Sequence, residues 1–336
     1  MKRVVTFGEL LLSLSAPGNH RLVQAEEFTA RYTGAEANAA VSLAHFGVEA
    51  FVVSKVPAHE IGQACLNALR RFGVHTDYVL RGGDRLGLLY MEVGASQRAT
   101  KVIYDRAASS FRQLRAEELD WNQILTGKDW FHFSGTAPAL GPQVVEALTT
   151  GLATARQLGL TVSCDCNYRS KLWSKEEAGR VLTPLLEFVN VLICGKDDPQ
   201  GIFGISSEEA DAAGADRDRH TVELLRRRFG LDYVAMTFRE GVSASHNRWA
   251  AMLCHGGGVC RSRQYEIQIV DRVGGGDAFA AGLIFGLLSD FGPQRAIDFA
   301  AAAACLKHSI PGDFNLVSRD EVEQLLAGDS AGRVRR

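Results

Sequence analysis

Segments with the hydrophobic pattern of a strand alternate with segments that have the pattern of a helix along most of this 336-residue chain. Such alternation favours a mostly parallel sheet with helices on both faces, because parallel neighbours need a crossover connection. We therefore predict a doubly wound α/β fold. The predicted strands are 4–7, 50–54, 130–133, 160–166, 189–194 and 233–238, and the predicted helices are 35–46, 62–72, 143–157, 176–188, 221–229, 293–306 and 318–326, with a further helix from about residue 275.

Two segments, residues 11–33 and 78–105, interrupt this alternation. The second contains strand-like runs at 86–93 and 100–104 without a helix between them. We predict that the two segments meet as a small separate β-sheet, a lid over a site at the carboxyl ends of the main strands. The main domain would then comprise residues 1–10, 34–77 and 106–330, with 331–336 as a flexible tail.

Composition and charge narrow the class of protein. Hydrophobic residues make up 46%, charged residues 23%, and the formal net charge is -2, which is typical of a globular protein and calls for no nucleic-acid partner. No signal-peptide core begins the sequence, and no apolar run reaches membrane-spanning length. The seven cysteines lack the paired spacing of a zinc site. We expect a cytoplasmic protein with no membrane or nucleic-acid partner.

Residues 271–277, here called the glycine turn, place three glycines and a carboxylate where a strand-like run gives way to a helix. Glycine amides approach ligands closely and a helix N-terminus is partially positive, so this turn suits an anion, although a plain tight turn is an alternative. Asp277 would repel a phosphate unless it accepted a proton from a hydroxyl that attacks phosphorus. The chain lacks a G-x-x-x-x-G-K-[ST] loop, and no G-x-G-x-x-G follows the first strand, which disfavours P-loop enzymes and Rossmann dehydrogenases.

With other segments, the glycine turn resembles the ribokinase-like carbohydrate kinases of the PfkB family. The family's D-T-x-G-A-G-D-x-F signature corresponds to residues 271–279, and residues 8–9 and 33–40 resemble its early turns. The likeness extends to the 2-keto-3-deoxygluconate kinases through residues 104–106, 165–169, 172–173 and 311–315. It implies a ribokinase-like fold and an enzyme that uses ATP and Mg²⁺ to phosphorylate the C6 hydroxyl of 2-keto-3-deoxygluconate.

The resemblance also implies roles for individual residues. Asp277 would be the general base, and the glycine amides would hold the transferring phosphoryl group. The carboxylate of a sugar acid favours guanidinium groups, which Arg106 and Arg169 would supply. The phosphoryl site would comprise Gly274, Gly275 and Gly276. The sugar site would comprise Gly34, Asn38, Tyr90, Tyr104, Arg106, Arg169 and Asp313. The nucleotide site would comprise Asn167, Thr237, Arg239, Gly241, Gly274, Gly276 and Ala301, with Asp198 acting on Mg²⁺ through water.

Each sugar-site residue has a structural alternative. Tyr90 and Tyr104 are candidates for ordinary strand aromatics, the two arginines for surface ion pairs, and Asp313 for a turn residue. Two histidines, His132 and His308, fall near the inferred site, where structural roles are favoured. The functional interpretation therefore depends on the whole set.

Three residues depart from the family pattern. Gly195 stands where the family has the asparagine of its magnesium element, Arg272 replaces a threonine, and Gly275 replaces an alanine. We expect Gly275 to be harmless to the amides and Arg272 to add a charge near the phosphates. Two alternatives stay open: a kinase of the galactonate epimer or of a neutral ketohexose, and a sugar-acid-binding regulatory protein with weak catalysis. Exposed lid edges further predict a homo-oligomer that assembles through the lid.

Overall fold

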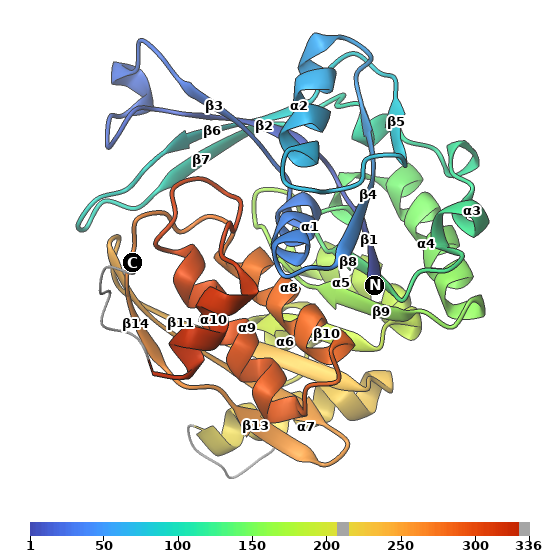
Figure 1. Ribbon diagram of the computed structural model, residues 1–336, viewed down its shortest axis with the longest axis vertical. Coiled ribbons are helices and arrows are strands. Elements are labelled where there is room, and N and C mark those ends of the chain that lie inside the picture. The colour runs from blue at the N-terminus through green and yellow to red at the C-terminus, as the bar shows by residue number, and fades with distance from the viewer. Residues whose placement is uncertain (207–214, 329–336) are drawn as a thin grey trace.

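The computed structural model describes residues 1–206 and 215–328, which form a large sheet and a small one (Figure 1). The strands of the large sheet are β1 (Arg3–Phe7), β4 (Glu49–Val56), β5 (Val79–Arg81), β8 (Trp130–Ser134), β9 (Thr161–Asp165), β10 (Val191–Gly195), β11 (Tyr233–Ser243), β12 (His246–His255), β13 (Gly258–Arg261) and β14 (Tyr265–Gln268). Their order is β13-β12-β11-β10-β9-β8-β1-β4-β5, with β14 beside β12. All pairs from β11 to β5 are parallel, and β12 to β14 pair antiparallel.

Alternation along the strands divides the interior into two cores, one on each face of the large sheet. On β1, Val4 packs into one core and Val5 and Phe7 into the other. The first core is covered by α1 (Ala35–His45), α2 (Glu60–Arg70), α8 (Gly275–Leu288), α9 (Pro293–Lys307) and α10 (Arg319–Leu326). The second is covered by α3 (Trp121–Leu125), α4 (Pro142–Gln157), α5 (Lys175–Leu185), α6 (Asp198–Phe203) and α7 (Ala215–Phe229).

Helix α8 is buried on nearly all sides, which fixes the position of its first turn. A Cβ at Gly282 would lie 2.8 Å from the Cα of Ala300, and one at Gly286 would lie 2.9 Å from the Cα of Ala296. These two glycines therefore let α9 approach α8 closely. The N-terminus of α8 is held at the carboxyl edge of the large sheet as a result.

The small sheet projects from the main body as a lid (Figure 1). Its order is β3-β2-β6-β7, with bounds β2 (Leu11–Ser15), β3 (Thr29–Thr33), β6 (Gly87–Glu92) and β7 (Lys101–Asp105). Leu11, Leu89 and Met91 form a small buried cluster on its inner face, and Val273 of the glycine turn packs against that cluster. The lid thus meets the main domain at the glycine turn.

The structure confirms the predicted fold class, a doubly wound and mostly parallel sheet with a small second sheet. The sequence pattern did not predict the antiparallel strands β12, β13 and β14. The lid boundary at residue 78 is wrong, because β5 pairs with β4 and belongs to the large sheet. The predicted tail at 331–336 lies outside the described residues. None of the helices in 1–206 and 215–328 has both the length and the hydropathy of a membrane span.

Candidate active site

Polar residues gather where the parallel strands end. Glu9 follows β1, Ser134 ends β8, Asn167 follows β9, and Gly195 ends β10 beside Thr237 of β11. Because these strands are parallel, their carboxyl ends share one edge of the sheet, where ligands bind in open α/β folds. The first turns of α1 and α8 reach the same edge and complete the candidate site.

The three glycines of the glycine turn have different surroundings. Gly274 is the N-cap of α8 with φ 80°, and a Cβ there would lie 2.0 Å from the carbonyl oxygen of Asp313. A Cβ at Gly275 would lie 2.5 Å from Cε1 of His308, which fills that space. Gly276 is exposed and has no neighbour within 4 Å of its Cβ position. Gly276 is therefore the glycine of the turn with open space at its Cβ position, at a helix N-terminus that suits an anion.

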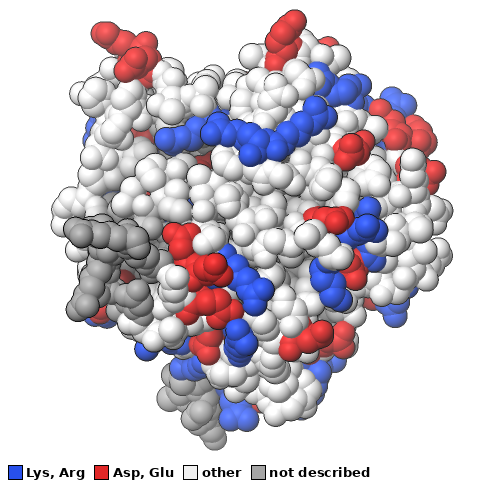
Figure 2. Space-filling model, in the orientation of Figure 1, with Lys and Arg blue, Asp and Glu red and all other residues white. Residues whose placement is uncertain are grey.

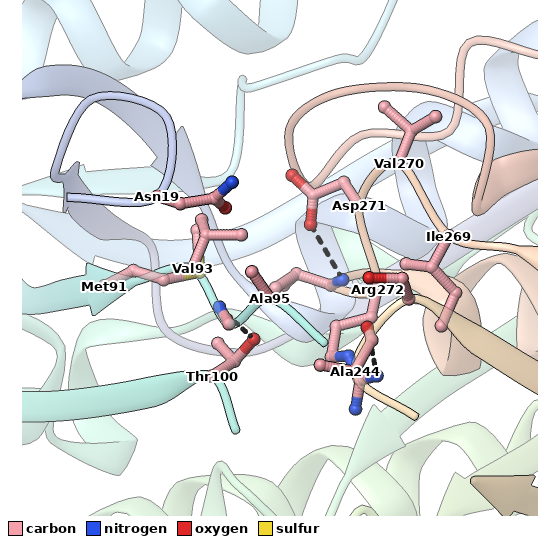
Figure 3. Close-up of a pocket in the computed structure, with 13 residues that line it drawn as sticks. Asn19, Met91, Val93, Ala95, Thr100, Ala244, Ile269, Val270, Asp271 and Arg272 are labelled. Carbon is pink, nitrogen blue, oxygen red and sulfur yellow. Dashed lines mark hydrogen bonds between the residues drawn. The ribbon is translucent and has the colours of Figure 1, made fainter. Parts of the chain in front are cut away.

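Asp271 and Arg272 fasten the glycine turn to its neighbours (Figure 3). Oδ1 of Asp271 accepts a hydrogen bond from the Val273 amide at 3.1 Å, and Oδ2 accepts one from the Gly312 amide at 2.8 Å. Nη2 of Arg272 donates to the carbonyl of Ala244, at the tip of the β11–β12 hairpin, at 2.8 Å. Asp271 thus organises the turn, and Arg272 links it to the hairpin.

Two amide side chains orient the carboxylate of Asp277. Nδ2 of Asn38 donates to Oδ2 at 2.7 Å, and Nδ2 of Asn167 donates to Oδ1 at 3.4 Å. Asn38 is itself fixed, because the Thr33 hydroxyl donates to its Oδ1 at 3.2 Å. Asn167 holds a left-handed backbone conformation with φ 38°, which is unusual for a residue other than glycine and frequent at functional sites.

The surroundings of Asp277 suit it to accept a proton near neutral pH. Burial raises the pKa of Asp277 to about 6, against the lowering effects of the Asn38 hydrogen bond and the Arg169 charge. Asp313 raises this pKa further and Lys307 lowers it. A carboxylate with such a pKa is mostly ionised at pH 7 yet is a stronger base than an ordinary aspartate.

The two predicted sugar-acid arginines lie in different environments. Arg106 is 8% exposed, and its Nε donates to Oε2 of Glu9 at 2.5 Å. Its guanidinium also lies 5.6 Å from the centre of the Tyr104 ring. Arg169 is exposed, and its guanidinium makes no hydrogen bond or ion pair with the described part of the chain. The charge of Arg106 is therefore largely neutralised by Glu9, whereas Arg169 is available to an anion.

Further positive charge lies beside Arg169. Partial burial lowers the pKa of Arg239, and the charges of Arg272 and Arg169 lower it further. Three guanidinium groups, one from β11 and two from loops, are therefore close enough to repel one another. Such a group is suited to a polyanion, whose binding relieves the repulsion.

The two predicted lid tyrosines lie on opposite faces of the lid. Tyr104 pairs with Leu89 across β6 and β7 and so shares the inner face, whereas Tyr90 pairs with Ile103. The ring of Tyr90 lies 6.2 Å from that of Phe28, which is 41% exposed. The structure therefore does not bring Tyr90 together with the other sugar-site residues, since neighbouring residues of a strand point to opposite faces.

Asp313 and Gly34, two predicted sugar-site residues, lie near the edge of the large sheet. Asp313 is 4% exposed, and its carboxylate oxygens make no close hydrogen bond with the described residues, although the Thr33 hydroxyl is near enough to lower the pKa of this carboxyl. Burial raises the pKa of Asp313. Gly34 caps α1, and a Cβ there would lie 2.3 Å from the carbonyl oxygen of Glu9. An unsatisfied buried carboxylate needs a partner, which a sugar hydroxyl can supply.

Sequence reasoning missed several charged residues of this site. Glu36 accepts hydrogen bonds from the amide of Ser134 at 2.9 Å and from its hydroxyl at 2.6 Å. Burial raises the pKa of Glu36 to about 7 and that of Asp165 to about 8. Arg31, on the inner lid face, lies 3.4 Å from the Cβ position of Gly312. Glu36 and Asp165 lie within the motifs that carried the resemblance, a signal that was overlooked.

The predicted nucleotide residues are only partly brought together. The hydroxyl of Thr237 donates to the Cys194 carbonyl at 3.4 Å, and Gly241 lies at a register shift near the tip of β11. Both accompany Arg239 at the edge of the site. The inclusion of Ala301 is wrong: it lies inside α9, 0% exposed, in the core between α8 and α9. Its small side chain serves helix packing.

The described residues contain no group of three or more His, Cys, Asp or Glu side chains that could hold a metal ion. Oδ2 of Asp198 accepts a hydrogen bond from the Gly195 amide at 2.7 Å, and burial raises the pKa of this carboxyl. One carboxylate at this edge fits Mg²⁺, which keeps several waters and binds mainly to substrate phosphates.

A cavity of about 210 Å³ lies between the lid and the glycine turn, beside their contact at Val273 (Figure 3). Met91 and Thr100 line it from the lid, and Asp271 and Arg272 line it from the turn. The Ala244 amide donates to the Ser96 carbonyl at 2.7 Å, which joins the β11–β12 hairpin to the lid tip. Figure 2 shows basic side chains in a row across the upper part of the viewed face, an arrangement that attracts anions.

Comparisons with known proteins agree on one family. The model of the pfkB family carbohydrate kinases matches residues 1–316. A 2-dehydro-3-deoxygalactonokinase of Haloferax volcanii is 34% identical over 98% of each chain. The crystal structure of a 2-dehydro-3-deoxygluconokinase of Thermotoga maritima has 46% identity and a TM-score of 0.94, over 97% of this chain and 98% of that one. That of a PfkB family carbohydrate kinase of Listeria grayi has 36% identity and a TM-score of 0.91, over 97% of this chain and 100% of that one.

Proposed function

The chain belongs to the PfkB family of carbohydrate kinases, and from this premise we propose that it transfers the γ-phosphoryl group of ATP to the C6 hydroxyl of 2-keto-3-deoxygluconate. Asp277 carries the proposal, because two amides orient this buried carboxylate in the first turn of α8. Relatives named as kinases of 2-dehydro-3-deoxy sugar acids, the same class of compound, support the substrate class.

In the proposed reaction, Asp277 accepts the proton of the C6 hydroxyl as that oxygen bonds to the γ-phosphorus. The bond between the γ-phosphorus and the β–γ bridging oxygen breaks, and ADP leaves with those electrons. The N-terminus of α8, with the exposed residue Gly276 in its first turn, stabilises the charge on the transferring group. Asn38 and Asn167 keep the carboxylate aimed at the hydroxyl.

The remaining contacts divide between the two substrates. Arg239 and Arg272 attract the triphosphate, while Asp198 is the side chain that would hold Mg²⁺ through water. When bound, that ion neutralises phosphate charge. The unpaired guanidinium of Arg169 binds the carboxylate of the sugar acid, and Asp313 accepts hydrogen bonds from its hydroxyls. Arg106 positions Tyr104 on the inner face of the lid.

An assay of ADP release with a panel of substrates tests the proposal. We expect kcat/KM for 2-keto-3-deoxygluconate to exceed that for fructose or ribose at least 100-fold, because Arg169 then meets its anionic partner. Arg169→Gln should raise KM for the acid at least 30-fold. NMR of the product should show phosphorus coupled to the C6 protons. Turnover of a neutral sugar in preference to the acid would overturn the substrate assignment and leave the family intact.

The galactonate epimer is the second candidate substrate, because the 34% identical Haloferax volcanii relative is named for it. The two acids differ at one hydroxyl, which a single group such as Asp313 can distinguish by about 10-fold or more. The same assay separates them. Equal kcat/KM values would make the enzyme a kinase of both epimers, and a higher value for the galactonate compound would replace the first proposal.

We also propose a homo-oligomer that assembles through the outer face of the lid. This face is opposite the inner cluster and carries partly exposed apolar side chains, with Ile103 at 43% exposure and Phe28 at 41%. Such a surface on a four-stranded sheet gains stability when a second copy covers it. Sedimentation should show an oligomer that Ile103→Asp dissociates, whereas Leu158→Asp, at an exposed leucine of the main domain, should leave it intact. A monomeric wild type would refute this assembly.

A further inference from the structure

Lys307 stands out because it is a lysine buried without an ion pair. It is the last residue of α9 and is 0% exposed. Its Nζ donates to the Ile310 carbonyl at 3.2 Å and makes no ion pair with the described carboxylates. Lysine is almost never fully buried unless it is paired. A charge that is costly to desolvate and only half satisfied calls for a further interaction.

The position of Lys307 is directly behind the glycine turn. A Cβ at Gly274 would lie 3.2 Å from its Cε, so the side chain passes beneath the N-cap of α8. Burial lowers the pKa of Lys307, whereas the charges of Asp271, Asp313 and Asp277 raise it. These carboxylates come from the loop before α8, the loop after α9 and the first turn of α8. The ammonium is therefore the buried cation that they share.

We propose that Lys307 is a positioning residue whose ammonium, held behind Gly274, balances the carboxylates around the glycine turn so that an anionic phosphoryl group can approach Asp277. Without this cation, the negative charges of Asp271, Asp313 and Asp277 would lose a buried counter-charge beside the turn. Lys307 acts through Gly274 and the carboxylates and touches neither substrate. This role rests on the proposed function. It supplies a full positive charge beside the turn, which the glycine amides alone do not provide.

The main test replaces the ammonium with a neutral side chain of similar length, Lys307→Met. We expect kcat to fall about 100-fold while KM for the sugar acid changes less than threefold. The fold should persist, because a methionine removes the desolvation cost of a buried charge. Lys55→Met is the matched control, since Lys55 is 8% exposed but pairs with Glu118 at 2.5 Å, far from the turn in sequence. It should leave kcat unchanged.

A second readout follows the protonation of Asp277 and does not depend on turnover. Carbon-13 NMR of labelled aspartate, with Asp277→Asn to identify the signal, measures its titration in both backgrounds. Loss of a nearby cation should move the midpoint upward in Lys307→Met. The charged or titratable groups that act on Asp277 from other elements must be unchanged in both proteins: Glu36 of α1, Asp165 of β9, Arg169 of the loop after β9, and Asp313 of the loop after α9.

Rescue separates electrostatics from packing. In Lys307→Ala, propylammonium should restore kcat at least 10-fold, whereas propanol, a neutral molecule of similar size, should not. A folded Lys307→Met with kcat within twofold of wild type and an unmoved Asp277 midpoint would overturn the proposal. If the wild type phosphorylates none of the sugar acids, the proposed substrate fails, and the NMR midpoint alone decides the role of Lys307.

Discussion

The glycine turn and the lid meet across one cavity, yet they are held in place very differently. In the turn, the Cβ positions of Gly274 and Gly275 are filled by Asp313 and His308, so the backbone has one arrangement. The lid contacts the main domain through the small apolar cluster around Val273, through Leu12 and Tyr32, which pack against the first core, and through hydrogen bonds at Ser96 and Val102. The difference implies a rigid chemical centre beneath a cover that is attached by separate, smaller contacts.

The largest effect should come from Asp277, the proposed general base in the rigid centre. Asp277→Asn should lower kcat about 10³-fold, because the amide accepts no proton from the hydroxyl. ATP affinity measured by calorimetry should change less than threefold. Asp77→Asn, at a carboxylate with a 71% exposed side chain, serves as the control and should be fully active. Near-normal turnover by Asp277→Asn would remove its role as base and with it the centre of the comparison.

Gly274→Ala tests the rigidity of the turn itself. A methyl group 2.0 Å from the Asp313 carbonyl, on a residue with φ 80°, must displace the turn or the loop after α9. We expect a loss of about 1–3 kcal/mol in the free energy of unfolding and a fall in kcat of about 100-fold, because small misplacements at a reacting centre are costly.

Gly276→Ala is the matched control for the predicted loss of stability in Gly274→Ala, because no atom lies within 4 Å of its Cβ position. Its melting temperature should stay within about 2 °C of wild type, since a free surface position contributes little to stability. Equal destabilisation by the two alanines would mean that the crowding at Gly274 does not fix the turn.

A change in pH should affect activity and stability in opposite directions, because the same buried carboxyl groups govern both. Burial raises the folded-state pKa values of Asp277, Glu36 and Asp165 to about 6, 7 and 8. Between pH 4 and 8 the folded protein therefore binds more protons than the unfolded chain, and these groups lower the free energy of unfolding as pH rises. Below pH 6, kcat/KM should fall about tenfold per unit as Asp277 protonates.

Urea unfolding at pH 5.5 and pH 8 measures the predicted change in the free energy of unfolding. Initial rates over the same range measure the predicted change in kcat/KM. Asp165→Asn should flatten the dependence of stability on pH, because its pKa of about 8 is the highest of the three. A protein that gains stability from pH 5.5 to 8 would show that lid or surface groups dominate its proton linkage.

The sequence predicted the parts of the molecule that local patterns determine. The parallel strands, their helices and the glycine turn all have local signals in hydrophobic spacing and glycine content. The environment of Arg106 has no such signal, because its partner Glu9 is 97 positions away. Burial of Lys307 follows from the packing of α9 against α8, which a single-sequence pattern does not reveal.

Two interpretations needed the three-dimensional register. Tyr90 and Tyr104 are both strand aromatics, but their faces depend on how β6 pairs with β7, and one residue of shift reverses the face. Gly275 was expected to be harmless in place of alanine. The structure gives it a reason, because His308 occupies the space that an alanine methyl would need. In both cases the sequence indicated what kind of residue stands at the position, but only the structure shows which residues surround it.

The smallest expected effect belongs to the lid. Met91 is 2% exposed in the inner cluster and lines the cavity above the turn. Met91→Ala should raise KM for the sugar acid about threefold to tenfold through weaker closure, with kcat changed less than twofold because the turn is intact. Leu148→Ala, fully buried in a main core, should instead lower the melting temperature without changing KM. A large fall in kcat for Met91→Ala would mean that the lid shapes the chemical centre and that the two regions are one unit.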